Sequence, residues 1–157
     1  FIIVGILYER RHTKALVAYG GIWKALPLLG GLSLIVVLSS MGLPGLNGFV
    51  GEFTILLGSL GSAVTGFGFT FFATLGVILA AIYMLYFFQR IFMGPLDKKE
   101  NENLPPLTWQ EVAALVPLIV MIFWIGLAPQ TFFGAMDSTV GHLVAQIGPF
   151  IQQMAGG

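Results

Sequence analysis

Residues 25–62 contain a single charged side chain, Glu52, and this restricts the possible folds more than any other feature of the sequence. One transmembrane helix needs about 20 apolar residues, so this stretch exceeds the length of a single span. Residues 67–88 and 112–127 carry no charge at all. Only 9 % of the chain is charged, against about 25 % in soluble domains. The sequence therefore predicts an all-α polytopic membrane protein and excludes a soluble enzyme.

Apolar and polar stretches alternate along the chain and predict its elements. The chain opens on apolar residues without an initiator Met, so we expect the C-terminal part of a longer protein. Residues 137–154 show apolar positions at helical spacing, which is typical of an amphipathic surface helix, and Asp137 or Ser138 is its expected N-cap. The other expected segments are the end of a transmembrane helix at 1–8, a loop at 9–24, a discontinuous transmembrane helix at 25–62 broken at 42–45, a transmembrane helix at 67–92, a loop at 93–108 and a transmembrane helix at 109–130.

Basic residues gather in the loops 9–24 and 93–108. Short loops rich in Lys and Arg stay on the cytoplasmic side of a membrane. Both loops lie on one side only if residues 25–62 cross an odd number of times before the single crossing at 67–92. The charge pattern therefore favours one broken span at 25–62 over two complete spans, and it puts the C-terminus on the opposite side.

Glu52 follows closely on the interruption Gly42-Leu43-Pro44-Gly45. An ionisable group at membrane depth costs about 2.5–3.5 kcal/mol and often belongs to an ion or proton path. Irregular backbone occurs there only where protein buries it or where it lines a cavity. In a helix, Gly48, Leu56 and Ser59 share the face of Glu52. The pattern indicates that Glu52 transfers protons. The alternatives are a structural ion pair and a carboxylate that caps the second half-helix.

Small and polar residues near the break are candidates for lining a water-filled path, although Ser59 and Thr74 are each more typical of a hydrogen bond within or between helices. Neither His12 nor His142 has a second ligand nearby, so no metal site is expected. The chain has no cysteine and no net charge, which excludes Fe–S ligation and gives no sign of nucleic-acid binding. The path candidates are Ser39, Ser40, Asn47, Gly48, Ser59 and Thr74, and the helix-break residues are Gly42, Pro44 and Gly45.

A family signature is carried by the run Ser39-Ser-Met-Gly-Leu-Pro-Gly-Leu-Asn-Gly-Phe-Val-Gly-Glu-Phe53. It resembles the antiporter-like membrane subunits of NADH:quinone oxidoreductase, respiratory complex I. Gly5-Ile-Leu-Tyr-Glu-Arg-Arg-His12 and Gly126-Leu-Ala-Pro129 are similar to helix ends of that family. The resemblance implies the last part of a fourteen-helix fold, from the end of helix 11 through broken helix 12 to helix 14. Most of the family carries lysine at the position of Glu52, so the resemblance implies the branch with glutamate there.

The resemblance also implies a function, which is proton translocation coupled to quinone reduction, with Glu52 as the proton-transfer residue. The implied partners are other membrane-arm subunits, above all the neighbouring antiporter-like ones, and the lipid bilayer. The implied location is the bacterial inner membrane, with the loops 9–24 and 93–108 cytoplasmic and the C-terminus periplasmic. FMN, Fe–S clusters and quinone are expected elsewhere in the complex, and no cofactor is expected on this chain. The buried lysines that would partner Glu52 are expected in the rest of the protein.

Two alternatives stay open at this point. The first is a subunit of a multisubunit cation/proton antiporter or of a membrane-bound hydrogenase with the same fold. The second is a membrane subunit in which Glu52 has only a structural role. Within the favoured class, the motif also leaves open whether NADH or ferredoxin is the electron donor.

Overall fold

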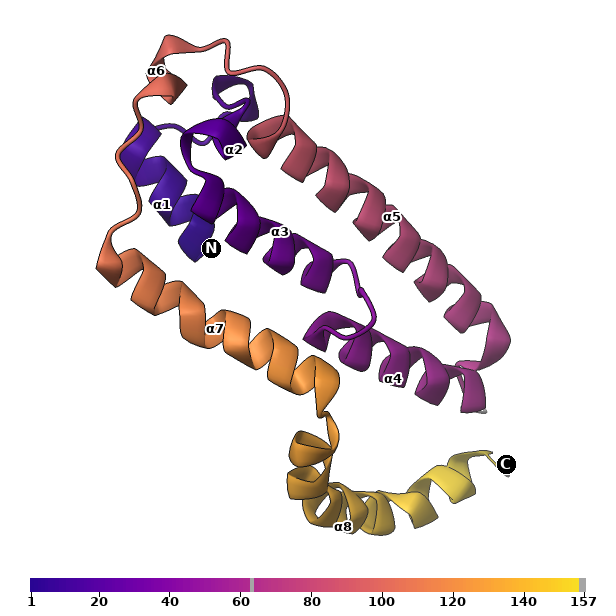
Figure 1. Ribbon diagram of the computed structural model, residues 1–157. Helices are drawn as coiled ribbons and strands as arrows, with labels where there is room; N and C mark the ends of the chain where they lie inside the picture. The colour runs from indigo at the N-terminus through magenta and orange to yellow at the C-terminus, as the bar shows by residue number, and fades with distance from the viewer. Residues whose placement is uncertain (63, 156–157) are drawn as a thin grey trace.

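The computed structural model describes residues 1–62 and 64–155, and these residues form helices joined by short loops (Figure 1). No strand occurs in those ranges, which confirms the predicted all-α class. In chain order the elements are α1 (Ile2–Arg11), the 3-10 helix η1 (Leu16–Ala18), α2 (Ile22–Ala25), α3 (Pro27–Ser40), α4 (Asn47–Gly61), α5 (Gly66–Phe92), α6 (Lys99–Glu102), α7 (Trp109–Leu127) and α8 (Gln130–Ala155).

Two of these helices, α5 and α7, are long and apolar enough to cross a membrane, with mean hydropathies of 2.2 and 2.0 over their most apolar windows. Most side chains in those windows are not buried within the chain, unlike those of a core helix in a soluble protein. Helix α3 is apolar but too short to cross alone, and α4 continues in the same direction after it (Figure 1). Together α3 and α4 form one discontinuous span.

The interruption between α3 and α4 covers residues 41–46. Gly42 and Gly45 have φ angles of +70° and +93°, in the left-handed region that glycine adopts without strain. Pro44 lies between them and has no N–H to donate to a continuing helix. The amide of Leu43 donates to the carbonyl of Leu38 at 3.1 Å, which satisfies one of the free carbonyls at the end of α3.

The tightest packing lies toward the start of α3 and the end of α5. Ile22, Leu29 and Phe88 are almost fully buried there, and the ring of Trp23 meets Phe88 edge-on at 6.0 Å. Farther along, α4 packs against both α5 and α7. The discontinuous span is therefore fixed at its basic end and contacts two helices beyond the break.

The loops 9–24 and 93–108 lie at the same end of the helices and bind one another (Figure 1). The Gly21 amide donates to the Met93 carbonyl at 3.0 Å, and the Asn101 amide group donates to the Ala18 carbonyl at 3.2 Å. We call these joined loops the basic cap. The two loops thus share one end of the helices, and their placement on the cytoplasmic side stays a prediction.

Several boundaries differ from the predicted ones. Helix α1 continues to Arg11, within the expected loop 9–24, and the expected loop 93–108 contains α6. The largest difference is at the C-terminus, where α8 begins at Gln130 instead of 137. Asp137 and Ser138 therefore lie inside a helix and do not cap it. Pro129 precedes the first residue of α8, because proline is accommodated at a helix start, where its missing N–H has no partner to lose.

Candidate functional site

Glu52 lies on the side of α4 that faces the other helices. The four residues predicted to share this face are each half-buried, whereas their neighbours on the opposite face are exposed. The half-buried set is Gly48, Glu52, Leu56 and Ser59, and the exposed set includes Phe53, Ile55, Leu57 and Leu60. The predicted stripe is thus the inner face of the second half-helix.

The side chain of Glu52 folds back against the break. A methyl group placed on Gly42 would lie 3.2 Å from the carboxyl carbon of Glu52 and closer still to its Oε2 atom. The left-handed φ of +70° favours glycine at position 42, and a β-carbon there would displace the carboxylate of Glu52 from its present place. The structure brings the predicted acid and the predicted break into direct contact.

Two further glycines let backbone segments meet at the same place. A β-carbon on Gly48 would collide with the carbonyl oxygen of Ser39, at the end of α3. A β-carbon on Gly126, at the end of α7, would lie 2.5 Å from the carbonyl carbon of Gly45 and 2.5 Å from the Cα of Leu46. Backbone atoms cannot rotate away as side chains do, so these contacts require glycine. The ends of α3 and α7 and the start of α4 thus form a backbone junction beside Glu52.

Ser39 and Asn47 link the two half-helices across the break. The hydroxyl of Ser39 donates a hydrogen bond to Oδ1 of Asn47, the first residue of α4, and Ser39 is only 5 % exposed. The neighbouring Ser40 is exposed and donates to the Val36 carbonyl of its own helix at 2.9 Å. Of the two candidate serines, the structure therefore places Ser39 at the break and turns Ser40 away from it.

The other two polar candidates form a separate group between α4 and α5. The hydroxyl of Thr70 lies 3.0 Å from that of Ser59, and Thr74 donates to the Thr70 carbonyl at 2.8 Å. Ser59 is two helical turns beyond Glu52, on the same face of α4. Ser59 therefore extends the polar stripe, whereas the hydroxyl of Thr74 serves its own helix.

Glu52 has no ion-pair partner in the part of the chain that the structure describes, where the one salt bridge is Arg10–Glu111. It also lies beyond the first turn of α4, which has no side-chain cap. The capping alternative is therefore wrong, and an ion pair within these residues is not seen. The role of Glu52 in proton transfer stays a prediction.

The pair Arg10–Glu111 was not predicted from the sequence, although it joins α1 to α7. The guanidinium donates to both carboxylate oxygens, at 2.6 and 2.8 Å, and to the carbonyls of Pro105 and Pro106 at 2.9 and 3.0 Å. Glu111 also accepts from the Thr108 amide at 2.6 Å in a capping box. The bond to Glu111 raises the pKa of Arg10 above its ordinary value, so Arg10 stays cationic.

Known proteins similar to this chain are membrane subunits. The model of a family described as "NADH:quinone oxidoreductase/Mrp antiporter, TM" matches residues 1–89. NADH-quinone oxidoreductase subunit M of Rickettsia bellii is 40 % identical over 146 residues, covering 93 % of this chain and 29 % of that protein. Subunit M of Rhodobacter capsulatus is 35 % identical over 160 residues, and the match covers 99 % of this chain and 31 % of that protein.

A solved structure is similar as well. Respiratory complex I from Thermus thermophilus with bound NADH contains a chain that superposes with a TM-score of 0.73 and 31 % identity. The match covers 83 % of this chain and 27 % of that one. The present chain thus spans less than a third of the length of the relatives it matches.

Proposed function

Because this chain belongs to the NADH:quinone oxidoreductase/Mrp antiporter membrane family, we propose that it is the C-terminal part of a proton-translocating membrane-arm subunit of NADH:quinone oxidoreductase. The branch is subunit M, the name carried by the relatives that match most of the chain. Glutamate at position 52, in place of the lysine typical of the family, supports the same branch. The chain acts as part of a translocase, and the redox centres reside elsewhere in the complex.

One observation carries this proposal: an acid on the inner face of α4 lies against the backbone break of a membrane-spanning element. Between Lys24 and Arg90 the sequence has no other charged group, so a proton crossing beside α3 and α4 has Glu52 as its one acid or base in this stretch. Backbone groups freed at a break bind water inside a membrane protein. Glu52 therefore takes up a proton from one side of the break and releases it to the other.

The exposed outer face of α4 supports the proposed partners. Its large apolar side chains are uncovered here, and the remainder of the protein and the neighbouring antiporter-like subunits cover them in the complex. The basic cap lies at the end opposite to the last residues of α4 and to α8 (Figure 1). With the cap in the cytoplasm, the C-terminus is periplasmic and the chain crosses the bacterial inner membrane.

A second candidate function is a subunit of a cation/proton antiporter, because the matching family includes the Mrp antiporters. It would use the same break and the same acid. The two functions differ in what drives transport, since an antiporter responds to a sodium gradient and the proposed subunit responds to quinone reduction.

The substitution Glu52→Gln in the intact complex tests the proposal. We expect normal assembly with loss of both NADH:quinone activity and proton pumping in sealed vesicles, because the amide cannot exchange a proton. Glu52→Asp should retain part of both. Glu100→Gln, which removes an exposed carboxylate from the basic cap, is the matched control and should pump normally.

Normal activity and pumping in Glu52→Gln would assign a structural role to this residue and would contradict the proposal. Proton transport that depends on sodium, with no dependence on NADH, would instead support the antiporter candidate.

A further inference from the structure

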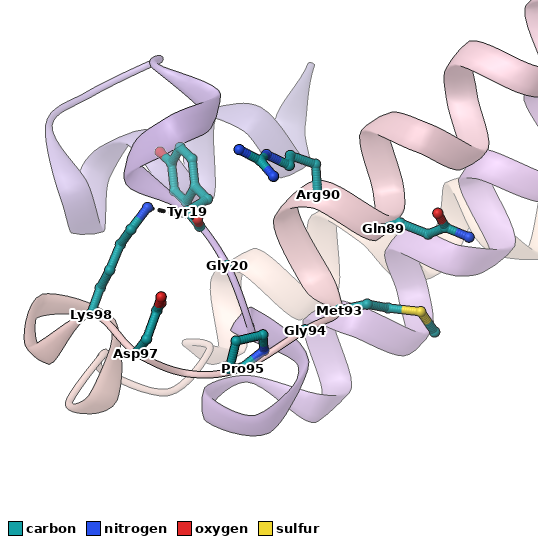
Figure 2. A pocket seen from close by; sticks show the side chains of 9 residues that line it. All are labelled: Tyr19, Gly20, Gln89, Arg90, Met93, Gly94, Pro95, Asp97 and Lys98. Atoms are coloured by element: carbon teal, nitrogen blue, oxygen red, sulfur yellow. Dashed lines mark hydrogen bonds between the residues drawn. The ribbon is translucent and has the colours of Figure 1, made fainter.

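A polar cavity of about 290 Å³ opens where the end of α5 meets the basic cap (Figure 2). It lies far from Glu52 along the chain and has no part in the proposed proton transfer. Its volume is near the lower limit for ligand sites, which suits a small polar group. The side chains on its wall include Tyr19, Gln89, Arg90, Met93, Asp97 and Lys98.

The cavity lies at the depth of lipid headgroups. Helix α5 is a membrane-spanning candidate that ends at Phe92, and the wall of the cavity continues directly from it through residues 93–98. Tyr83 and Tyr86 are 61 % and 63 % exposed, and they lie about one and a half to two and a half helical turns before that end. Tyrosines gather at the membrane–water boundary, so they favour a boundary near this end of α5, with the cavity on its polar side.

Two cations line the cavity, and one of them is fixed in place. The ammonium group of Lys98 donates to the Tyr19 carbonyl at 3.0 Å, and Arg90 lines the same cavity from the end of α5 (Figure 2). Arg90 is exposed and has no ion-pair partner among the described residues. Its planar guanidinium matches the geometry of phosphate oxygens. Lys98 and Arg90 thus bring two positive charges to the wall of one cavity.

Asp97 is the remaining charge on the wall, and its carboxylate leaves a net charge of +1 there. A carboxylate repels phosphate but accepts hydrogen bonds from hydroxyl groups. Ile82 and Leu85, on the adjoining turns of α5, are exposed apolar side chains suited to an acyl chain. The two cations, the carboxylate and the apolar side chains together suit a ligand with a phosphate, a hydroxyl-bearing headgroup and a hydrocarbon tail.

We infer that this cavity binds an anionic phospholipid whose headgroup carries hydroxyl groups, such as phosphatidylglycerol. Arg90 and Lys98 contact the phosphate, Asp97 accepts from a headgroup hydroxyl, and the outer face of α5 receives an acyl chain. The inference depends on α5 crossing the membrane and is independent of the role of Glu52.

Photolabelling of the full-length protein in its membrane assembly tests the inference. The assembly is reconstituted into phosphatidylcholine vesicles with a trace of photoactivatable phosphatidylglycerol, and the labelled peptides are identified by mass spectrometry. We expect labelling at residues 82–98. Arg90→Gln should lower it about fivefold, the contribution of one basic residue to anionic-lipid binding. Lys99→Gln removes an equal charge outside the cavity wall and should leave labelling unchanged.

Two comparisons on the unmodified protein complete the test without any substitution. Equal labelling by a phosphatidylcholine probe would show apolar contact alone and would overturn the inference. Loss of labelling in an excess of inorganic phosphate would assign the site to a soluble phosphate group and would overturn the lipid assignment. Unchanged labelling of an assembled Arg90→Gln protein would contradict the role of the cavity.

Discussion

The carboxyl group of Glu52 lies against Gly42, across the break that separates α3 from α4. An acid from the second half-helix thus lies against a residue of the break itself. The position of the carboxylate therefore depends on the shape of the break as much as on α4 itself, and the predictions below follow from this dependence.

Gly42→Ala should disturb the site without removing its acid. The new methyl group needs the space of the Glu52 carboxylate, and alanine at a φ of +70° adds about 1 kcal/mol of strain. We expect lower thermal stability of the complex and reduced proton pumping per NADH oxidised. Gly58→Ala is the matched control in α4, because no atom lies within 4 Å of the added carbon. Equal pumping in both variants would contradict the importance of this contact.

Gly126→Ala should displace α7 from the break. The added carbon meets backbone atoms of Gly45 and Leu46, so the helices must separate, at an expected cost of about 1–3 kcal/mol. Thermal unfolding of the complex measures this loss. Gly134→Ala, in the exposed part of α8, has open space around it and should leave the unfolding temperature unchanged.

Ser39→Ala should weaken the link between the half-helices, because it removes the donor to Asn47. The expected destabilisation is about 1 kcal/mol, typical of one hydrogen bond, together with a lower ratio of protons pumped to NADH oxidised. Ser40→Ala makes the same chemical change on the neighbouring exposed residue and serves as the control.

A double-mutant cycle of Ser39→Ala with Asn47→Ala isolates the bond itself. If the two residues act through their mutual hydrogen bond, the double variant should lose less stability than the sum of the single variants. Additive losses would show that the residues act separately.

Arg10→Ala should loosen the basic cap. Its loss leaves Glu111 with hydrogen bonds from Thr108 alone and removes this donor from the Pro105 and Pro106 carbonyls. The side chains of Arg10 and Glu111 are only 5 % and 14 % exposed. We expect about 3 kcal/mol of destabilisation and faster proteolysis of the loop before α7. Arg10→Lys keeps the charge but loses the bidentate contact with the carboxylate. Its loss of stability should therefore lie between those of the parent protein and Arg10→Ala. Lys24→Ala, at an exposed position, is the control and should match the parent protein in stability and in the rate of proteolysis.

The sequence predicted the helical class and the spans because a membrane restricts which side chains a helix can carry. Residues 67–92 had to be helical, since unpaired backbone groups are too costly in lipid. The backbone preferences of glycine and proline predict an interruption at Gly42, Pro44 and Gly45. The structure confirms it, because α3 ends before these residues and α4 begins after them. These features depend on local chemistry, which a sequence displays directly.

The remaining features depend on which segments meet in space. Arg10 and Glu111 are separated by 101 positions, so no local pattern announces their contact. Gly126 lies in an apolar run, and the sequence gives no reason for a glycine there. The reason is the close approach of backbone atoms from the break, which only the structure shows. The predicted start of the last helix at 137 is wrong, because Pro129 lies directly between two helices and proline is accommodated at a helix start as well as after a helix end.

The meeting of Gly126 with Gly45 has a mechanical consequence. Main chain rests on main chain there, with no side chain between them to absorb a shift by changing rotamer. Helix α7 is clamped at its other end by Arg10. Helix α7 therefore joins the basic cap at one end to the break beside Glu52 at the other, through contacts that leave little room for either end to move alone.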